Sequence, residues 1–512
     1  MDFVEKDSSP SKRSNPSGKD DNKRVRSSAG SSRNNNNDEP MEGNEDLVFE
    51  DPFGDEFEEE DYNDNGDDDE DDEEAVERMA RGEDGEEEEE VDEAPKHVWR
   101  PGIDKIEEGE ELEYDPSAYI MYHSLRTEWP CLSFDILKDN LGENRQRYPF
   151  SMFVVTGSQA DKQDKNKLTL LKLSDLHKTH ASNDSDEEDN EDDDNVDEDP
   201  TLEHINIPHY GGVNRIRSMP QNAGIVCSLA ETGQSHVYDL SAPLNSLMVR
   251  GAPRGQQVTK PVYTYKGHKT EGYALDWSPV TAGQIATGDN SGAIQIWKME
   301  SNSSSWSMEG GPFIGHRNSV EDIQWSPTEA TVFSSCSSDK TIKIYDTRQK
   351  ERNKAQISID AHFEDINVMS WNRNVTYLLA SGCDDGSFKV WDLRALRDKT
   401  KGEIAKFEFH KQPVTSIEWA PHDESVLCVS SADNQVTVWD LSVEEDADVS
   451  NGTGDILGGD LAKEFPAQLL FIHQGQYNVK EVHYHSQIPG LIMSTAEDGF
   501  NIFKPAISSS NN

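Results

Sequence analysis

The sequence predicts an all-β protein, a seven-bladed β-propeller, and two repeated spacings support this prediction. An aromatic residue follows each of five histidines after 29 positions, and successive units recur every 46–48 residues apart from insertions. A tryptophan also stands nine positions after four of these histidines. A period of this length is typical of architectures in which each repeat is one structural unit. The five histidines are His209, His268, His316, His362 and His410.

Each unit contains short runs in which apolar and polar residues alternate, as in "TIKIYD" at 341–346 and "QVTVWD" at 435–440. Tight turns such as Asp385-Gly386 separate the runs. Alternating runs joined by tight turns predict antiparallel strands. Four strands per unit with a closing Trp-Asp are typical of a propeller blade.

Six units are clear, and strand alternation at 150–157 and 167–176 implies a seventh. The segment 129–137 ("WPCLSFDIL") is expected to supply the outer strand that closes the ring with the last blade. The predicted propeller therefore spans 129–505 and is followed by a disordered tail at 506–512.

Negative charge is concentrated in two segments of the chain. The formal net charge is −53, and 38–93 holds 32 acidic residues against two basic ones, while 184–199 holds 12 acidic residues. Like charge at this density with few large apolar residues cannot offset chain entropy, so we expect a disordered acidic arm over 38–110. Acidic insertions are expected at 181–200 and 442–465. Such a charge repels nucleic acids and anionic membranes and attracts strongly basic proteins.

The first 37 residues differ from this arm because they form a basic, Ser- and Asn-rich tail that is expected to be disordered. Two basic clusters separated by nine residues are typical of a bipartite nuclear import signal, which places the protein in the nucleus and nucleolus, with shuttling from the cytoplasm. A basic patch without an import role is the alternative interpretation. Five dispersed cysteines without a CxxC pair indicate a reducing compartment. The import residues are Lys12, Arg13, Lys23, Arg24 and Arg26.

Several units contain a histidine, a serine and an aspartate that resemble a hydrolase triad. Because the set recurs along the chain, we interpret it as a buried hydrogen-bond chain that ends on the strand tryptophan. Ser291 and Thr232 replace the aspartate in the third and second units, which predicts weaker sets there. The sequence therefore predicts no enzyme. The structural sets are His316, Ser335 and Asp339; His362, Ser381, Asp385 and Trp391; and His410, Asp433 and Trp439.

A metal site is weakly indicated at one place only. Glu481, His483 and His485 alternate on one predicted strand face, but no further ligand of matching spacing is visible. The sequence also contains no glycine-rich phosphate loop and no nucleophile elbow. We therefore predict neither a metal nor a cofactor.

The loops of a propeller present side chains to partners, so function is sought in those loops. Residues just after each histidine and just before each turn aspartate are expected at one mouth of the ring, and several are acidic. Scattered surface carboxylates are the alternative interpretation. The predicted partner-binding residues at this mouth are Glu271, Glu364, Asp365, Asp384 and Glu497.

Two segments outside the regular repeat add to the predicted binding surface. Residues 111–128 place apolar side chains at roughly helical spacing, so we expect an amphipathic helix that packs on the side of the propeller. Between the last two blades lies an acidic, Gly-rich loop. The predicted binding residues are Tyr119, Tyr122 and Leu125 in the helix, and Glu444, Glu445, Asp446 and Asp448 in the loop.

The repeats over about 118–505 closely resemble the WD-repeat family. "EWPCLSF", "GGVNRIRSMPQN", "KGHKTEGYALDWSP" and "QLLFIH" are similar to its histone-binding branch, which includes subunits of chromatin assembly and deacetylase complexes. That resemblance implies a groove between Tyr119–Leu125 and Glu444–Asp448 that grips a basic helix, although the loop here lacks the paired prolines of that branch. With the acidic arm and basic tail, the chain resembles the glutamate-rich WD-repeat proteins.

This second resemblance implies a nuclear and nucleolar factor of large-subunit ribosome assembly. Its expected client is the newly made, basic ribosomal protein L-three, which it would deliver to pre-60S particles without binding nucleic acid through the acidic arm. Histones are the alternative client, in a chaperone or chromatin complex. Another alternative is a ubiquitin ligase receptor that docks through Arg348 or Arg394 in "YDTR" and "WDLR". Ser182 and Ser185 precede acidic residues, so we expect an acidophilic kinase to phosphorylate them.

Overall fold

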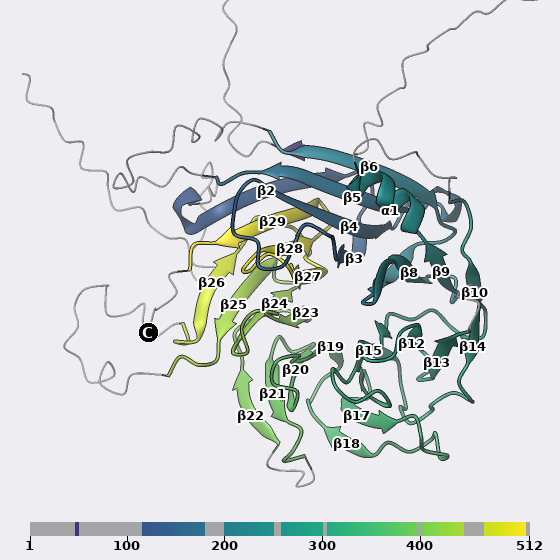
Figure 1. The fold of residues 1–512 in the computed structure, drawn as a ribbon. Helices are drawn as coiled ribbons and strands as arrows, with labels where there is room; N and C mark the ends of the chain where they lie inside the picture. The colour runs from purple at the N-terminus through teal and green to yellow at the C-terminus, as the bar shows by residue number, and fades with distance from the viewer. Residues whose placement is uncertain are drawn as a thin grey trace, which may run out of the picture. The chain divides into compact units, whose positions relative to one another are not determined.

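The computed structural model describes seven stretches of the chain. They are residues 47–50, 115–179, 199–249, 258–300, 305–396, 402–444 and 465–507. Within them, seven antiparallel sheets stand side by side around a central axis (Figure 1). The predicted seven-bladed, all-β propeller is confirmed. No helix in these stretches is long and apolar enough to cross a membrane.

Each blade is a four-stranded sheet whose strands follow one another in sequence, apart from the last blade. Strand bounds for blades one to four are β3 (Cys131–Leu137), β4 (Phe150–Ser158), β5 (Lys167–Leu176) and β6 (Thr201–Pro208); β7 (Val213–Met219), β8 (Asn222–Ala230), β9 (Ser235–Asp239) and β10 (Tyr263–Tyr265); β11 (Leu275–Trp277), β12 (Gln284–Gly288), β13 (Ile294–Met299) and β14 (Trp306–Met308); and β15 (Val320–Trp325), β16 (Val332–Ser337), β17 (Thr341–Asp346) and β18 (Ile357–Asp360).

Blades five and six continue this order, and blade seven takes two strands from the N-terminal side of the chain. Their bounds are β19 (Ile366–Trp371), β20 (Leu378–Cys383), β21 (Phe388–Asp392) and β22 (Glu403–Phe407); β23 (Val414–Trp419), β24 (Val426–Ser431), β25 (Gln435–Asp440) and β26 (Leu469–His473); and β27 (Glu481–Tyr484), β28 (Ile492–Thr495), β29 (Gly499–Pro505), β2 (Tyr119–Thr127) and β1 (Leu47–Glu50). The helical segments are η1 (Pro116–Ala118), η2 (Gln163–Lys165) and α1 (Ser241–Met248).

The expected helix over 111–128 is wrong for its described part, because Tyr119–Thr127 forms strand β2. β2 pairs antiparallel with β29, with Leu125 opposite Phe500. Tyr119, Met121 and Leu125 are buried, so the apolar residues follow the two-residue period of a strand. Helical spacing and strand spacing overlap at these positions, and pairing with the last blade selects the strand.

The expected closing role of 129–137 is also wrong. Cys131–Leu137 is the innermost strand of the first blade, and β2 closes the ring as an outer strand of the last one. A further strand, β1, pairs with β2 in antiparallel register from Leu47 opposite Thr127 to Glu50 opposite Ser124. The arm over 38–110, expected to be disordered, therefore contains a strand at Leu47–Glu50, and only that part of it lies within the described residues.

The core of the molecule lies between neighbouring blades. One apolar cluster joins Cys336 and Ile342 of blade four to Ile366 and Met369 of blade five, and a similar cluster joins blades five and six. At the end of the chain, the Ala506 N–H donates to the Ala118 carbonyl, so the expected tail at 506–512 starts with a tethered residue. Each blade therefore depends on its neighbour for burial of its apolar face.

The inner strands are also joined by polar contacts from blade to blade. At six of the seven junctions a side-chain oxygen on one inner strand accepts a backbone N–H from the next. These pairs are Asp135 and Ser218 (2.7 Å), Asp276 and Trp325 (2.7 Å), Asp322 and Met369 (3.1 Å), Ser370 and Trp419 (3.4 Å), Glu418 and Tyr484 (3.2 Å), and Glu481 and Phe134 (2.9 Å). At the seventh, Arg215 Nε donates to the Tyr273 carbonyl at 2.8 Å.

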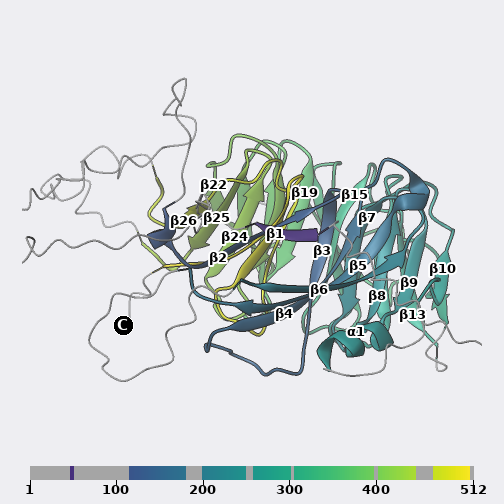
Figure 2. The same cartoon turned by 90° about the horizontal axis from the view of Figure 1, so that it is seen from above.

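The strand order places two kinds of connection on opposite faces of the ring. Connections from an outer strand to the next inner strand, and those from the second to the third strand of a blade, lie on one face, which we call the histidine face because it carries the repeated histidines. The other connections, including α1, lie on the opposite face (Figure 2).

Candidate functional site: the histidine face

The repeated histidines join the loops of the histidine face to the strands beneath them. His316 Nε2 lies 2.7 Å from Ser335 Oγ, and its Nδ1 lies 3.1 Å from Asp339. Burial lowers the pKa of His316, although Asp339 opposes that shift. A neutral imidazole held at both nitrogens has no free nitrogen for catalysis, and its geometry is that of a structural link.

The sets in blades five and six vary this arrangement. His362 Nε2 lies 2.8 Å from Ser381 Oγ, which accepts the Trp391 indole N–H at 2.9 Å. In blade six, His410 Nδ1 lies 3.0 Å from Asp433. There a residue that the sequence analysis omitted, Thr437, replaces the serine, because its hydroxyl lies 3.0 Å from His410 Nε2 and accepts the Trp439 indole N–H at 2.7 Å.

The expectation of a weakened set in blade three is wrong. His268 Nδ1 lies 3.1 Å from Asp289, two residues before Ser291, and its Nε2 lies 2.8 Å from Thr287. Ser291 instead donates to Asp289. In blade two the Gly211 carbonyl lies 2.8 Å from His209 Nδ1. The same contact therefore comes from different positions in different blades.

The five acidic residues predicted at one mouth all lie on the histidine face. Glu364, Asp384 and Glu497 are exposed, and Glu271 and Asp365 are half-buried. The Asn214 side chain donates to Glu271 and that of Asn367 donates to Asp384, both at 3.0 Å. Burial raises the pKa of Asp365, and the carboxylates of Asp384 and Glu364 raise it further. Crowded carboxylates of this kind favour a cationic partner.

Exposed aromatic side chains lie on the same face, and sequence reasoning missed them. Phe363 is 81% exposed, Tyr477 63% and Tyr210 59%. Tyr210 and Phe363 directly follow the histidines of their repeats, where the other three repeats have lysine or arginine. That contrast between repeats is a signal that the sequence contained. Aromatic faces beside carboxylates bind lysine and arginine side chains through cation–π contacts.

The groove expected between Tyr119–Leu125 and the acidic loop is not supported by the residues that the structure describes. Tyr119 is buried, and its hydroxyl lies 2.7 Å from His473 Nδ1, while Leu125 is buried in the core. Tyr122 is half-buried and accepts a hydrogen bond from Asn501. These side chains serve ring closure, so their assignment to partner binding is wrong.

Other predicted site residues fall partly outside the described stretches. Glu444 is exposed at the end of one such stretch. Glu445, Asp446, Asp448, the phosphorylation candidates Ser182 and Ser185, and the import residues Lys12, Arg13, Lys23, Arg24 and Arg26 lie outside the described residues. Their roles stay predictions.

The alternating set Glu481, His483 and His485 is divided between separate contacts. Glu481 is fully buried and accepts from Arg215 Nη1 at 2.5 Å and Arg217 Nη2 at 2.6 Å. His483 Nδ1 lies 2.7 Å from Glu418, whereas His485 Nδ1 accepts the Gln487 N–H.

These contacts set the charges at the centre of the ring. Burial disfavours the charged form of Glu481, but Arg217 and Arg215 outweigh it and hold the Glu481 pKa well below its usual range. Burial likewise opposes protonation of His483, but Glu418 and Glu481 raise its pKa to about 9. The centre is therefore an ion network that holds the inner strands together.

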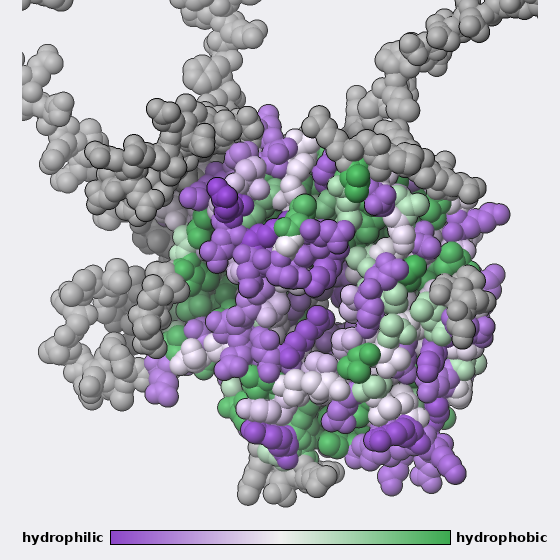
Figure 3. Space-filling view, viewed as in Figure 1, coloured by the Kyte–Doolittle hydropathy of each residue, from purple (hydrophilic) through white to green (hydrophobic). Residues whose placement is uncertain are grey.

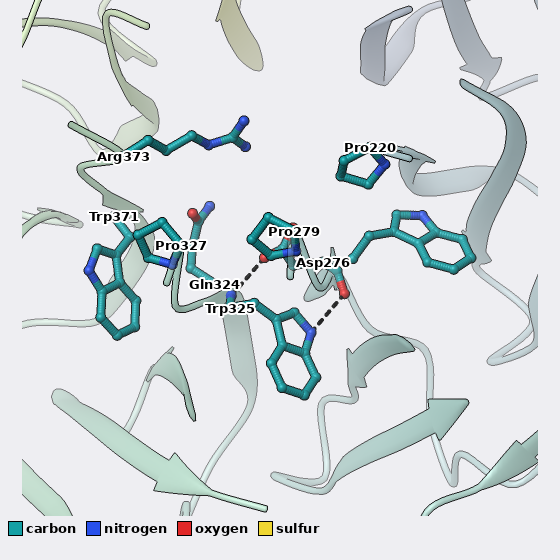
Figure 4. A pocket seen from close by; sticks show the side chains of 9 residues that line it. Pro220, Asp276, Pro279, Gln324, Trp325, Pro327, Trp371 and Arg373 are labelled. Atoms are coloured by element: carbon teal, nitrogen blue, oxygen red, sulfur yellow. Dashed lines mark hydrogen bonds between the residues drawn. The ribbon is translucent and has the colours of Figure 1, made fainter. Parts of the chain in front are cut away.

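On the opposite face, which Figures 1 and 3 turn toward the reader, hydrophilic side chains gather around the centre of the ring. A small pocket there is lined by turns of neighbouring blades (Figure 4), and its walls include Asp276, Trp325 and Arg373. Asp276 accepts the Trp325 backbone N–H at 2.7 Å. Burial raises the pKa of Asp276 to about 7, although that N–H opposes the shift. Its contacts are those of a blade junction.

Replacing Asp276 with asparagine is expected to change how stability depends on pH. Because the folded-state pKa lies above the ordinary value of 3.8, folding stability falls as pH rises from about 4 to 7. Asparagine keeps the acceptor for Trp325 and carries no charge, so Asp276→Asn should gain about 1 kcal/mol more, relative to the unmodified protein, at pH 8 than at pH 5.5. Urea unfolding at both pH values measures this. An equal change at both would show that packing, not ionisation, dominates.

Arg348 and Arg394, the residues of the ubiquitin-ligase alternative, are exposed at the starts of connections on the opposite face. Arg348 Nε donates to Asp346 at 2.9 Å, and Arg394 Nη2 donates to Asp392 at 2.7 Å. The Arg394 guanidinium also stacks 3.4 Å above the Tyr377 ring. Both arginines are therefore held in place by their own blades.

Comparisons with known proteins agree with this architecture. Residues 109–177 match a family model that describes the histone-binding protein RBBP4 and its counterpart in the CAF1 complex. Residues 310–346, 353–392 and 401–440 match the WD domain, G-beta repeat. The first match covers β2 and most of blade one, and the second covers blades four to six.

Three relatives align with most of the chain. Protein heat stress tolerant DWD 1 of Arabidopsis thaliana is 44% identical over 437 residues, which cover 80% of this chain and 92% of that protein. Ribosome assembly protein rrb1 of Schizosaccharomyces pombe is 43% identical over 417 residues, 80% of this chain and 84% of that one. Glutamate-rich WD repeat-containing protein 1 of Dictyostelium discoideum is 45% identical over 425 residues, 81% and 86% of the two chains. The chain therefore belongs to the family of glutamate-rich WD-repeat proteins, within the histone-binding branch of WD-repeat propellers.

Proposed function

We propose that this protein is a non-enzymatic assembly factor of the large ribosomal subunit. It binds a newly made basic ribosomal protein, L-three, in the nucleus and nucleolus and delivers it to pre-60S particles. The observation that carries this proposal is the combination of crowded carboxylates and exposed aromatic rings on the histidine face, in a chain with two polyanionic segments. Relatives named for ribosome assembly and for glutamate-rich WD repeats support the pathway.

The chemistry of such a client matches this face. A ribosomal protein that has not met its RNA exposes many lysine and arginine side chains, which bind any nucleic acid through counterion release. Carboxylates such as Asp365 and Asp384 attract these cations, and rings such as Phe363 hold their planar or aliphatic parts. The face therefore binds one basic segment of the client in a defined position.

The polyanionic segments act on the rest of the client. They compete with nucleic acid for lysine and arginine, and because they are tethered to the propeller their effective concentration is high. Screening at physiological salt limits the attraction to about 8 Å, so shielding works by close contact. Release follows when ribosomal RNA offers a denser anionic surface with contacts of matching shape.

Mass spectrometry of proteins that co-purify with the tagged full-length chain at moderate salt tests the client. We expect L-three to dominate and to decrease when residues 51–93 are deleted. The deletion starts after Glu50 because Leu47–Glu50 is strand β1 of the last blade. Retention of L-three by the deleted variant would contradict the shielding role. Dominant recovery of histones would contradict the proposed client and favour the alternative, which the match of residues 109–177 to the histone-binding model supports.

A triple variant tests the face itself. Tyr210→Ala, Phe363→Ala and Tyr477→Ala together should weaken binding of purified L-three at least tenfold, because three exposed rings are removed while the fold is unchanged. The matched control replaces exposed apolar residues away from the face, with Val280→Ala, Met308→Ala and Ile404→Ala. Titration by fluorescence anisotropy at fixed salt gives both affinities. Equal affinities would place the client elsewhere.

A further inference from the structure

Blade five differs from its neighbours at its repeated histidine. In blades three, four and six, Nδ1 of the histidine lies 3.0–3.1 Å from an aspartate carboxylate. In blade five, His362 is 6% exposed, and its Nδ1 has no hydrogen-bond partner. A buried ring nitrogen without a partner is costly, so it points to a ligand.

Both positions that supply an oxygen to this nitrogen elsewhere hold metal-ligating residues in blade five. Cys383 stands two residues after Ser381, as Asp289 stands two after Thr287 in blade three, and Asp385 stands four after Ser381, as Asp339 stands four after Ser335 in blade four. His362, Cys383 and Asp385 place one ligand atom each within 4.8 Å of the other two.

The Asp385 carboxylate is only partly used by the protein. Its Oδ1 accepts the Ser387 N–H at 2.9 Å and the Ser387 hydroxyl at 2.6 Å. In blade four the second oxygen of Asp339 faces His316, whereas the corresponding contact between Asp385 and His362 is replaced by the approach of Cys383. The side-chain nitrogen, sulfur and second oxygen therefore face a common point.

We propose that His362 Nδ1, Cys383 Sγ and the Asp385 carboxylate bind a divalent cation of the zinc type on the histidine face of blade five. Nitrogen, thiolate and carboxylate are zinc ligands, with bonds of about 2.0–2.3 Å, so the three atoms need to move together by about 1 Å. The fourth position of the tetrahedron is left to water.

Binding requires one proton to leave. The Cys383 thiol releases its proton to solvent, the thiolate bonds to the cation, and His362 stays neutral, with Nδ1 on the metal and Nε2–H donating to Ser381 Oγ. Burial raises the pKa of the free Cys383 thiol to about 11, so metal binding should strengthen as pH rises. The bound ion would fix the loop that carries Phe363 and the turn that carries Asp384.

Cobalt substitution of the full-length chain tests this site, since thiolate bound to Co²⁺ gives an intense charge-transfer absorption that oxygen ligands do not. The chain is treated with chelator, dialysed, and titrated with Co²⁺ under excess Mg²⁺, which saturates the acidic segments. We expect one Co²⁺ per chain with the charge-transfer band, displaced by Zn²⁺.

Variants assign the ligands. Cys383→Ser places the serine found at the same position in blades four and six (Ser337 and Ser431), so it should fold normally and lose the band. Asp385→Asn should weaken Co²⁺ binding at least tenfold, and the adjacent, exposed Asp384→Asn is the matched control that keeps it. Zn²⁺ should raise the thermal unfolding midpoint of the unmodified chain but not that of Cys383→Ser. Absence of the band in the unmodified chain, or its persistence in Cys383→Ser, would overturn the proposal.

Discussion

Replacing Glu481 with glutamine is expected to destabilise the propeller by about 3–5 kcal/mol, because two arginines at the centre of the ring lose their counter-ion. The side chains of Arg215 and Arg217 are only 13% and 19% exposed, and both donate to the same Glu481 oxygen. Glutamine is nearly isosteric, so the loss reports charge and not volume. Urea unfolding followed by tryptophan fluorescence measures it.

A surface carboxylate provides the control for this variant. Glu364 forms an ion pair with Lys340 at 3.0 Å, but both side chains are largely exposed. Glu364→Gln should therefore change the free energy of unfolding by less than about 1 kcal/mol. If Glu481→Gln were as mild as this control, the central network would not hold the inner strands together.

The same network predicts how stability changes with pH. The Glu481 contribution is present above its unfolded-state pKa near 4.5 and is lost as pH falls through its lower folded-state pKa. The His483 contribution is complete below the unfolded-state pKa of 6.5 and is lost as pH rises to about 9. Stability should therefore fall between pH 6.5 and 9, and Glu481→Gln should flatten this fall because His483 loses one of its two carboxylate partners.

The second large effect is expected from Gly499→Ala, which should separate the closing strand from the last blade. Gly499 has a φ of 137°, and an added Cβ would lie 2.1 Å from the Leu125 carbonyl oxygen and 3.0 Å from Arg126 Cα. Both are backbone atoms of β2, so a side-chain movement cannot relieve the clash. We expect a loss of about 3 kcal/mol or more.

Hydrogen exchange distinguishes loss of closure from general destabilisation. In Gly499→Ala, amides of β2 and β29 should exchange at least tenfold faster, with a smaller change in blades three to five. Gly311→Ala is the control, because an added Cβ there has no atom within 4 Å. Uniform acceleration in all blades would show that closure is not a separate step.

Much of the fold could be predicted from the sequence because its signals are local. The two-residue alternation, the turns and the fixed distance from histidine to aromatic residue repeat in each blade, and a blade is built from consecutive strands. The acidic residues of the histidine face followed from their positions in the repeat. The exposed rings of Tyr210 and Phe363 could have been found in the same way, since the other repeats have a basic residue there.

The tertiary structure alone decided the features that join distant parts of the chain. The apolar residues from Tyr119 to Leu125 fit either a helix or a strand, and only pairing with β29 selects the strand and buries them. Glu481 and Arg215 lie 266 residues apart, so no local pattern indicates their ion pair. The sequence by itself determined the number and kind of the blades, because local hydrogen bonding and alternation define each one. Ring closure, the central charges and the partnerless nitrogen of His362 depend on which strands become neighbours, which is a property of the closed ring.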